Sequence, residues 1–303
     1  MPITIDEAIA RIPSWKTASS VAVSLLPGGI TNFNYRVEVD GEAFVVRIGA
    51  RNAELLGIDR QREYQCIVAA SRTGVAPEVV HVLPDEGVLV TRYIAGRSLS
   101  SAEMVRPEMM ERVVRSIHRY HTGPAFAGFF SPFRTVEAYL RVARRYGAPL
   151  PEDIDAMFRR TPEIEATLRQ GRTIICPCHN DLWEPNLIDD GTLIRIVDWE
   201  YAGMGDGYFD LANFAIHYTL SDVQEEALLG TYFGEVSTVG FARLKLMRII
   251  AELREAMWCM VEVNVSEIEF DFTGYAMIHF DRYRQALGDA RLPGWLGLVA
   301  HGG

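Results

Sequence analysis

Cysteine is scarce in this sequence, with four residues in a chain of 303. So few cysteines cannot form the disulfide scaffold that stabilises many secreted domains. No run of about 18 apolar residues occurs, which argues against a transmembrane helix. Residues 1–7 also lack the basic segment and apolar run of a signal peptide. We therefore expect a cytoplasmic protein without a membrane span.

Basic residues are fewer than acidic ones. The chain has 30 Lys and Arg and 40 Asp and Glu, which gives a formal net charge of −10. Nucleic-acid binding depends on neutralising phosphates with Lys and Arg. The charge balance therefore argues against a nucleic-acid partner, and it favours a cationic ligand.

Two of the cysteines belong to the segment Cys176-Pro177-Cys178-His179. A second pair of ligands at the spacing of a zinc site is missing from the sequence, so no structural zinc is expected. We interpret residues 174–176 as a buried strand.

Residues 1–95 show the apolar pattern of a small antiparallel sheet. Asp40-Gly41 predicts a two-residue hairpin turn between two strands. Gly96 marks the break after this lobe. The expected elements are a first strand in the alternating apolar stretch that starts at Val21, further strands at 35–39, 44–48 and 88–94, and a helix at 59–70.

Residues 96–303 change to helical spacing, and Ser100-x-x-Glu103 matches a capping box. A chain of this size with 49% hydrophobic residues can divide into two lobes around a cleft. The sequence thus predicts an α+β fold with a small antiparallel-sheet N-lobe and a mainly helical C-lobe. The expected C-lobe elements are helices at 107–121, 135–146, 152–169, 241–263 and 267–286 and strands at 173–176 and 193–197.

The most informative segment runs from His179 to Asn186 and is followed by Asp198. Its spacing of Asp181, Asn186 and Asp198 is that of a kinase catalytic loop. Asp181 would accept the proton of an attacking hydroxyl group, and His179 would brace the loop by hydrogen bonding. Asn186 and Asp198 would hold Mg²⁺, which prefers oxygen ligands. The pattern predicts ATP-dependent phosphoryl transfer.

A glycine-containing segment, residues 26–35, lies between the first two expected strands. Glycine lets backbone N–H groups approach phosphate oxygens closely. Arg47 stands where kinases carry a lysine on the phosphates, and Glu63 stands where they carry its acidic partner. Arginine can also bind phosphate through two hydrogen bonds. Arg51 and Glu54 are weaker alternatives. The nucleotide would also contact Gly28, Gly29, Thr31 and Asn32.

Short motifs are spread over most of the chain, namely Gly-Gly-Ile-Thr-Asn at 28–32, Val-Arg-Ile at 46–48, His-Asn-Asp at 179–181, Asp-Trp-Glu-Tyr-Ala-Gly at 198–203 and Phe-Asp-Leu-Ala-Asn at 209–213. Together they resemble the choline/ethanolamine kinase family, within the wider group of aminoglycoside-phosphotransferase-like kinases. Arg47 and the pair Glu200-Tyr201 are similar to the choline branch in particular. The resemblance implies a protein-kinase-like fold in which Asp210 braces the catalytic loop.

The resemblance also implies an aromatic wall for a cationic acceptor, because ring faces attract quaternary ammonium groups. Two positions depart from the family, since His217 replaces an expected glutamate and Glu255 replaces a tryptophan. Glu255 lies one helical turn before Trp258, so we expect it to supply the missing negative charge. The alternatives are a solvent-facing Glu255 and a wall that is ordinary core. The expected acceptor residues are Glu200, Tyr201, Glu255, Trp258, Phe270 and Tyr275.

We therefore expect an enzyme that transfers the γ-phosphoryl group of ATP to a small cationic amino alcohol, with choline as the first candidate. Ethanolamine, an aminoglycoside, thiamine or another alcohol are alternative acceptors. The alternative outside the enzymes is a non-catalytic module that binds a nucleotide. The presence of all three polar residues, Asp181, Asn186 and Asp198, argues against this alternative. The sequence leaves open the nucleotide preference and the oligomeric state, including a homodimer.

Overall fold

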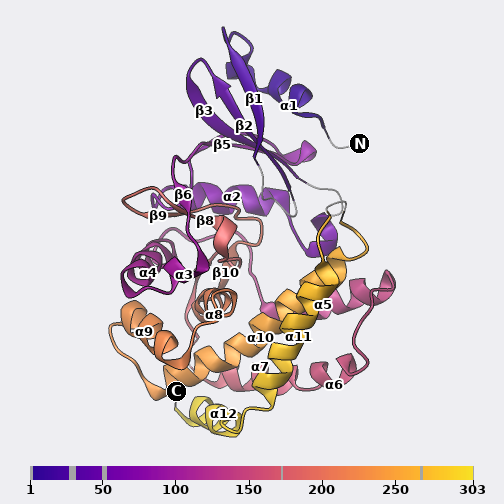
Figure 1. The fold of residues 1–303 in the computed structure, drawn as a ribbon, viewed down its shortest axis with the longest axis vertical. Coiled ribbons are helices and arrows are strands. Elements are labelled where there is room, and N and C mark those ends of the chain that lie inside the picture. The colour runs from indigo at the N-terminus through magenta and orange to yellow at the C-terminus, as the bar shows by residue number, and fades with distance from the viewer. Residues whose placement is uncertain (1–2, 27–31, 50–52, 172, 267–268, 303) are drawn as a thin grey trace.

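The computed structural model describes residues 3–26, 32–49, 53–171, 173–266 and 269–302, which form two lobes (Figure 1). A β-sheet lobe contains the N-terminal part of the chain, and a larger lobe contains most of the helices. The predicted α+β class, with a small antiparallel sheet lobe and a mainly helical lobe, is confirmed. Among the described helices, none combines the length and the apolar character needed to cross a membrane.

The N-lobe is built on a five-stranded antiparallel sheet in the order β1-β2-β3-β5-β4. The predicted hairpin is present, since Asp40 and Gly41 have φ angles of 49° and 87°, which suit a two-residue turn between twisted strands. One strand, β4, is not among the predicted elements. The bounds are β1 Val21–Leu26, β2 Asn32–Val39, β3 Glu42–Gly49, β4 Val79–Leu83 and β5 Val88–Arg92.

Strand β5 divides its side chains between two hydrophobic clusters, as the alternation of a strand requires. Val88 and Val90 belong to a small cluster that includes Ala8 of the unpredicted helix α1 (Ile5–Arg11). Leu89 belongs to the main cluster, which continues through the whole helical lobe. The sheet is therefore packed on both faces.

Helix α2 (Arg60–Ser71) lies below the sheet and carries Glu63 toward it (Figure 1). Asp59 caps the helix, because its carboxylate accepts hydrogen bonds from the backbone N–H groups of Gln61 and Arg62. The predicted helix at 59–70 thus agrees with the structure within one residue.

The C-lobe is organised around α10 (Thr238–Glu262), which is buried over most of its 25 residues. It packs against α5, α8, α11 and α12. The bounds of the other helices are α3 Ser101–Met104, α4 Pro107–His121, α5 Pro132–Arg145, α6 Ile154–Phe158, α7 Thr161–Gln170, α8 Gly207–His217, α9 Asp222–Phe233, α11 Phe272–Leu287 and α12 Leu292–His301.

Two small sheets hold the catalytic loop, which runs from β7 to β8. One sheet pairs β7 with β10, and the other has the order β6-β8-β9. Because β6 pairs with β8 of the helical lobe, we propose the lobe boundary between residues 95 and 96. The bounds are β6 Arg97–Ser98, β7 Ile175–Cys178, β8 Leu187–Asp189, β9 Ile194–Ile196 and β10 Gly203–Asp206.

The helices predicted at 135–146 and 241–263 each begin three residues earlier in the structure, and three other predictions differ in kind. The helix predicted at 152–169 is divided into α6 and α7, and Pro162 lies in the first turn of α7, where proline is tolerated. The helix predicted at 267–286 begins only at Phe272, after the cap residue Asp271. The interpretation of residues 174–176 as a buried strand is wrong for Ile175, whose side chain is 54% exposed.

Candidate active site

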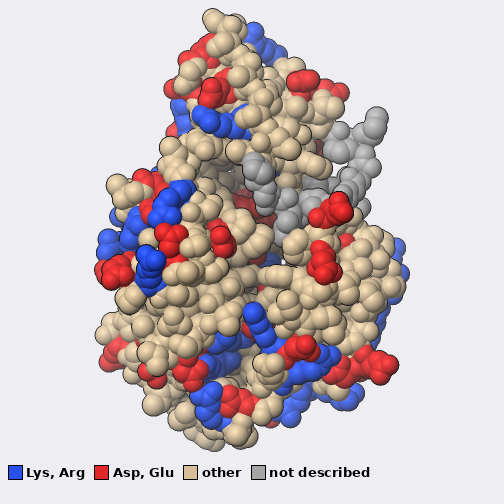
Figure 2. Space-filling model, in the orientation of Figure 1, with Lys and Arg blue, Asp and Glu red and all other residues tan. Residues whose placement is uncertain are grey.

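A cavity of about 650 Å³ lies between the two lobes, where the space-filling view shows the surface hollowed (Figure 2). Buried His179 and Glu63 lie behind its wall. The predicted positions Gly28, Gly29 and Thr31 lie outside the described residues. The predicted residues that line the cavity are Arg47, Asp181, Asn186, Asp198, Glu200, Tyr201, Glu255, Trp258, Phe270 and Tyr275.

His179 braces the catalytic loop from within the protein. Its Nδ1 accepts a hydrogen bond from the backbone N–H of Asp181 at 3.2 Å, and its Nε2 lies 3.0 Å from the carbonyl oxygen of Val197. These two bonds assign the proton to Nε2. Burial lowers the pKa of His179, which favours this neutral form. Both ring nitrogens are engaged, so the side chain is positioned to hold the loop rather than to accept a substrate proton.

Asp210, at the start of α8, fixes the same loop from below. Its carboxylate accepts hydrogen bonds from the backbone N–H groups of His179 and Asn180 at 2.8 and 2.6 Å. It also contacts Tyr120 Oη at 2.6 Å and His121 Nε2 at 3.0 Å. Burial acts to raise the pKa of Asp210, but the bonds from His121 and Tyr120 outweigh it and hold this pKa below its ordinary value. Asp210 therefore remains a charged anchor inside the core.

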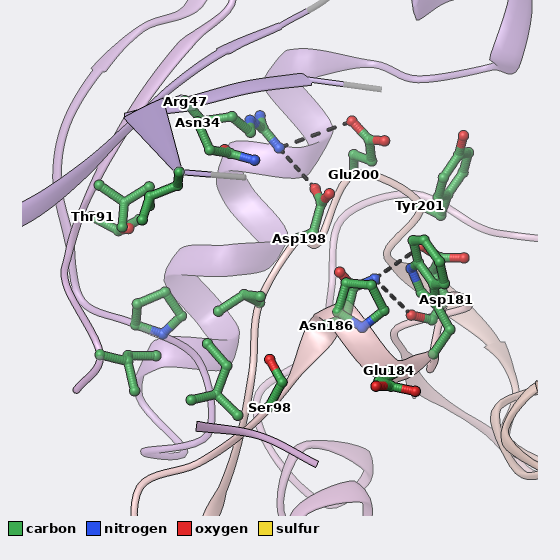
Figure 3. Close-up of a pocket in the computed structure, with 18 of the residues that line it drawn as sticks. Asn34, Arg47, Thr91, Ser98, Asp181, Glu184, Asn186, Asp198, Glu200 and Tyr201 are labelled. Atoms are coloured by element: carbon green, nitrogen blue, oxygen red, sulfur yellow. Dashed lines mark hydrogen bonds and ion pairs between the residues drawn. The ribbon is translucent and has the colours of Figure 1, made fainter. Parts of the chain in front are cut away.

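Asp181, Asn186 and Asp198 come together in the cavity (Figure 3). The Asn186 amide donates hydrogen bonds to the backbone oxygen of Asp181 at 2.9 Å and to its carboxylate at 3.0 Å. Burial, reinforced by Glu200, raises the pKa of Asp198 well above its ordinary range. A divalent cation would stabilise the charged form of this carboxylate, and the oxygen donors of Asn186 and Asp198 suit Mg²⁺.

The backbone around these residues is unusual in two places. Asn180 has a φ of 69° and Asp198 has a φ of 62°, in the left-handed region that Asn and Asp enter more readily than most residues. The Asn180 amide donates to the carbonyl oxygen of Tyr201 at 2.9 Å, which ties the catalytic loop to the segment after Asp198.

A largely buried group of charges links the two lobes on the side predicted to bind the nucleotide. Arg47 of β3 contacts Glu63 of α2 and donates to Asp198 at 3.0 Å. Arg60, which the sequence analysis missed, lies 2.9 Å from both Glu63 and Glu200. Its i, i+3 spacing to Glu63 is the signal that would have found it. Glu200 therefore faces these cations, although it also lines the cavity.

Asn32 extends this charged group toward the segment predicted to bind phosphates. Its amide donates to the Glu200 carboxylate at 2.9 Å, and its side-chain oxygen accepts from Arg60 at 3.1 Å. The one described residue of the predicted phosphate segment 28–32 is thus fixed against the C-lobe.

Aromatic side chains form the other end of the cavity. Trp258 Nε1 donates to Tyr201 Oη at 2.9 Å, and the Phe270 and Tyr275 rings pack with their centroids 5.8 Å apart. Trp183 also lines this end, and it is missing from the sequence prediction. Phe270 remains 40% exposed, so this part of the wall is not simply core.

Glu255 is buried rather than solvent-facing, and it already has a cationic partner. Arg254 Nη1 lies 2.5 Å from the Glu255 carboxylate and 3.3 Å from the Asp181 carboxylate. His217 Nε2 lies 3.7 Å from Glu255. Burial acts to raise the pKa of Glu255, but Arg254 outweighs burial and lowers it. Arg254 is not among the predicted site residues, because no spacing in the sequence connects it with Asp181.

Comparisons with known proteins show the family to which the chain belongs. Residues 22–246 match the phosphotransferase enzyme family, and the chain belongs to that family. Protein LicA of Haemophilus influenzae is 28% identical over 271 residues, which are 84% of this chain and 76% of that protein. Human ethanolamine kinase 2 is 24% identical over 302 residues, which are 89% of this chain and 77% of that protein.

A solved structure is similar over nearly the whole chain. The choline/ethanolamine kinase family protein from Mesorhizobium loti has a TM-score of 0.83 and 29% identity, and the match covers 97% of this chain and 98% of that one. The resemblance to this kinase family and the two-lobed, protein-kinase-like fold are confirmed. The chain is a kinase that acts on an alcohol group.

Replacing Arg254 should change the pH dependence of the reaction. Burial raises the pKa of Asp181, and Arg254 opposes this shift. In Arg254→Met the pKa of Asp181 should rise further, so the acidic limb of the kcat/KM profile should move to higher pH by about 1–3 units. Arg254→Lys keeps a cation and should move the limb less. Arg248→Met, in the same helix but paired with Glu225, is the control. An acidic limb unchanged in Arg254→Met would remove Arg254 from this role.

Replacing Asp210 should destabilise the protein. In Asp210→Asn a neutral amide can no longer accept from all four donors, so we expect a loss of about 3 kcal/mol in the free energy of unfolding. The control is Asp222→Asn, an ion-paired carboxylate whose side chain is 44% exposed and which should cost at most about 1 kcal/mol. Denaturant unfolding of both variants measures the difference, and equal losses would contradict the anchoring role.

Proposed function

We propose that this protein transfers the γ-phosphoryl group of ATP, in the presence of Mg²⁺, to the hydroxyl group of choline. One observation carries the proposal. Asp181 lies in a single cavity with the oxygen donors of Asn186 and Asp198 and with an aromatic wall that includes Tyr201 and Trp258. This arrangement offers a place for a metal-bound phosphate and a place for an organic cation, with the candidate base between them.

The roles of the polar residues follow from their contacts. Asp181 would accept the hydrogen bond of the acceptor hydroxyl group and take its proton during transfer. Arg47 would hold phosphate oxygens, and Glu63 orients Arg47 through their buried ion pair. Asn186 and Asp198 would hold Mg²⁺, which when bound neutralises charge on the phosphates.

The electrostatics of the aromatic end support a quaternary ammonium group. Such a cation has no N–H donors, so it binds through ring faces rather than through hydrogen bonds. Trp258 and Tyr275 offer rings, whereas the carboxylate of Glu255 already pairs with Arg254. The earlier expectation that Glu255 supplies an uncompensated negative charge is therefore not part of this proposal.

Ethanolamine is the second candidate acceptor. Its primary ammonium group has three N–H donors, and the carboxylate of Glu255, which can accept hydrogen bonds, lines the cavity. Human ethanolamine kinase 2, one of the relatives, acts on ethanolamine according to its name.

A panel assay tests the acceptor. ADP formation should be measured with choline, ethanolamine, thiamine and an aminoglycoside, and choline should give the highest kcat/KM.

Asp181→Ala should lower kcat by about 10²–10⁴-fold while nucleotide binding stays near normal, because only the base is lost. A preference for ethanolamine would favour the second candidate, and turnover like the wild type in Asp181→Ala would contradict the mechanism.

The metal ligands have their own test. Asp198→Asn and Asn186→Ala should weaken nucleotide binding in the presence of Mg²⁺ and reduce turnover together, since both side chains act through the same ion. Nucleotide binding without Mg²⁺ should change less. Asp155→Asn, whose side chain is 70% exposed, is the control. Titrations of Mg²⁺ that match the wild type in both variants would rule out this pair of ligands.

The aromatic wall should control acceptor binding. Trp258→Ala should raise the KM for choline by about 2–30-fold, which corresponds to the ~0.5–2 kcal/mol of a cation–π contact. At saturating ATP kcat should fall less, because ground-state binding is what the variant loses. Trp258→Phe keeps a ring and should retain more of the affinity. Equal KM values for the alanine and phenylalanine variants would show that the ring face is not what binds the acceptor.

A further inference from the structure

Cys176 and Cys178 place their sulfur atoms side by side under the catalytic loop. Both belong to β7, and residues two apart on a strand point to the same side. Their Sγ atoms lie 3.8 Å apart. Two thiolates bound to one tetrahedral zinc ion at about 2.3 Å would also lie about 3.8 Å apart. Two uncharged thiols in contact have a similar separation. The distance alone therefore does not distinguish a metal site from a thiol contact, and a third ligand is needed as evidence.

Helix α4 supplies that third ligand, because His121 is its last residue and is buried against the two cysteines. The ligand atoms of His121, Cys176 and Cys178 all lie within 4.8 Å of one another. The contacts of Gly207 show how closely the site is built. A Cβ atom there would come within 2.9 Å of Cys176 Sγ and 3.4 Å of His121 Nδ1. Glycine at this position therefore leaves room for both groups.

The imidazole of His121 is oriented as in a metal site. Its Nε2 lies 3.0 Å from the carboxylate of Asp210, which is the carboxylate–histidine arrangement that commonly supports a metal-bound histidine. Its Nδ1 is the nitrogen left for a metal ion, and a zinc ion there would replace the 2.6 Å hydrogen bond that this nitrogen makes with the hydroxyl group of Tyr232.

We propose that Cys176, Cys178 and His121 bind a zinc ion, with a water molecule completing a tetrahedron. Binding would release the thiol protons of the two cysteines, and the two thiolates would balance the charge of the ion in this buried place. Soft sulfur donors select zinc over Mg²⁺, so this site is chemically distinct from the oxygen donors Asn186 and Asp198.

The position of the site gives it a consequence for the catalytic loop. Cys178 directly precedes His179, and Asp210 contacts both His121 and the loop amide of His179. A zinc ion would therefore fasten the beginning of the loop to α4. This proposal reverses the expectation that there is no structural zinc. That expectation considered only ligands at close spacing in the sequence, whereas His121 is far from the two cysteines along the chain.

The test uses the full chain with any affinity tag removed, purified without chelator from cells grown with added zinc. Elemental analysis should find about one zinc ion per chain in the wild type, as a three- or four-ligand site predicts. Cys176→Ser should lose this zinc. Cys259→Ser, which changes another buried cysteine, should keep it. Zinc contents equal in the wild type and in Cys176→Ser would overturn the proposal.

Cobalt substitution gives a second readout that does not depend on the stability of a variant. Co²⁺ added to metal-free wild-type protein should produce a thiolate-to-cobalt charge-transfer band in the near ultraviolet, because the proposed site offers two thiolate ligands. Co²⁺ bound by Asn186 and Asp198 would give no such band. A folded wild-type protein that shows no band, or one in which Cys176 and Cys178 are joined by a disulfide, would also overturn the proposal.

Discussion

The carboxylate of Asp210 is the constraint on which the catalytic loop depends. It is fully buried, and it forms hydrogen bonds with two backbone amides of the loop and with the side chains of Tyr120 and His121. A charged acceptor inside the core would be costly without such donors, and with them it fixes the loop in one position. Asp181 can project into the cavity in a defined direction because the backbone on its N-terminal side is held in this way.

A second constraint is the balance of charge between the lobes. Arg47 and Arg60 of the N-lobe face Glu63, Asp198 and Glu200 at the inner wall of the cavity, where Arg47, Glu63 and Glu200 are buried. Removing one partner of such a group leaves a buried charge without compensation, at a cost of about 3–5 kcal/mol. The group thus specifies how the sheet lobe sits on the helical lobe, and it places the proposed phosphate-binding arginine opposite the proposed metal ligand.

Local signals made part of this structure predictable. The hairpin at Asp40-Gly41 and the helix at 107–121 were predicted at their observed positions, because turn chemistry and helical spacing act over a few residues. Likewise, the catalytic loop is continuous in sequence. Contacts between distant segments were not predictable in this way. Arg60 meets Glu200 and Arg254 meets Asp181 only after folding, and no spacing rule connects these pairs.

The left-handed backbone at Asp198 restricts how this position can vary among descendants of the chain. Asparagine keeps the short polar side chain that tolerates a φ of 62°, but it removes the charge. Glutamate keeps the charge, but its longer side chain loses the local contacts that make this conformation accessible to Asp and Asn. No single exchange preserves both properties. With Asp198 as the proposed metal ligand, one exchange to asparagine is expected to give a protein that folds but is inactive, whereas glutamate at this position is expected to require a different backbone conformation.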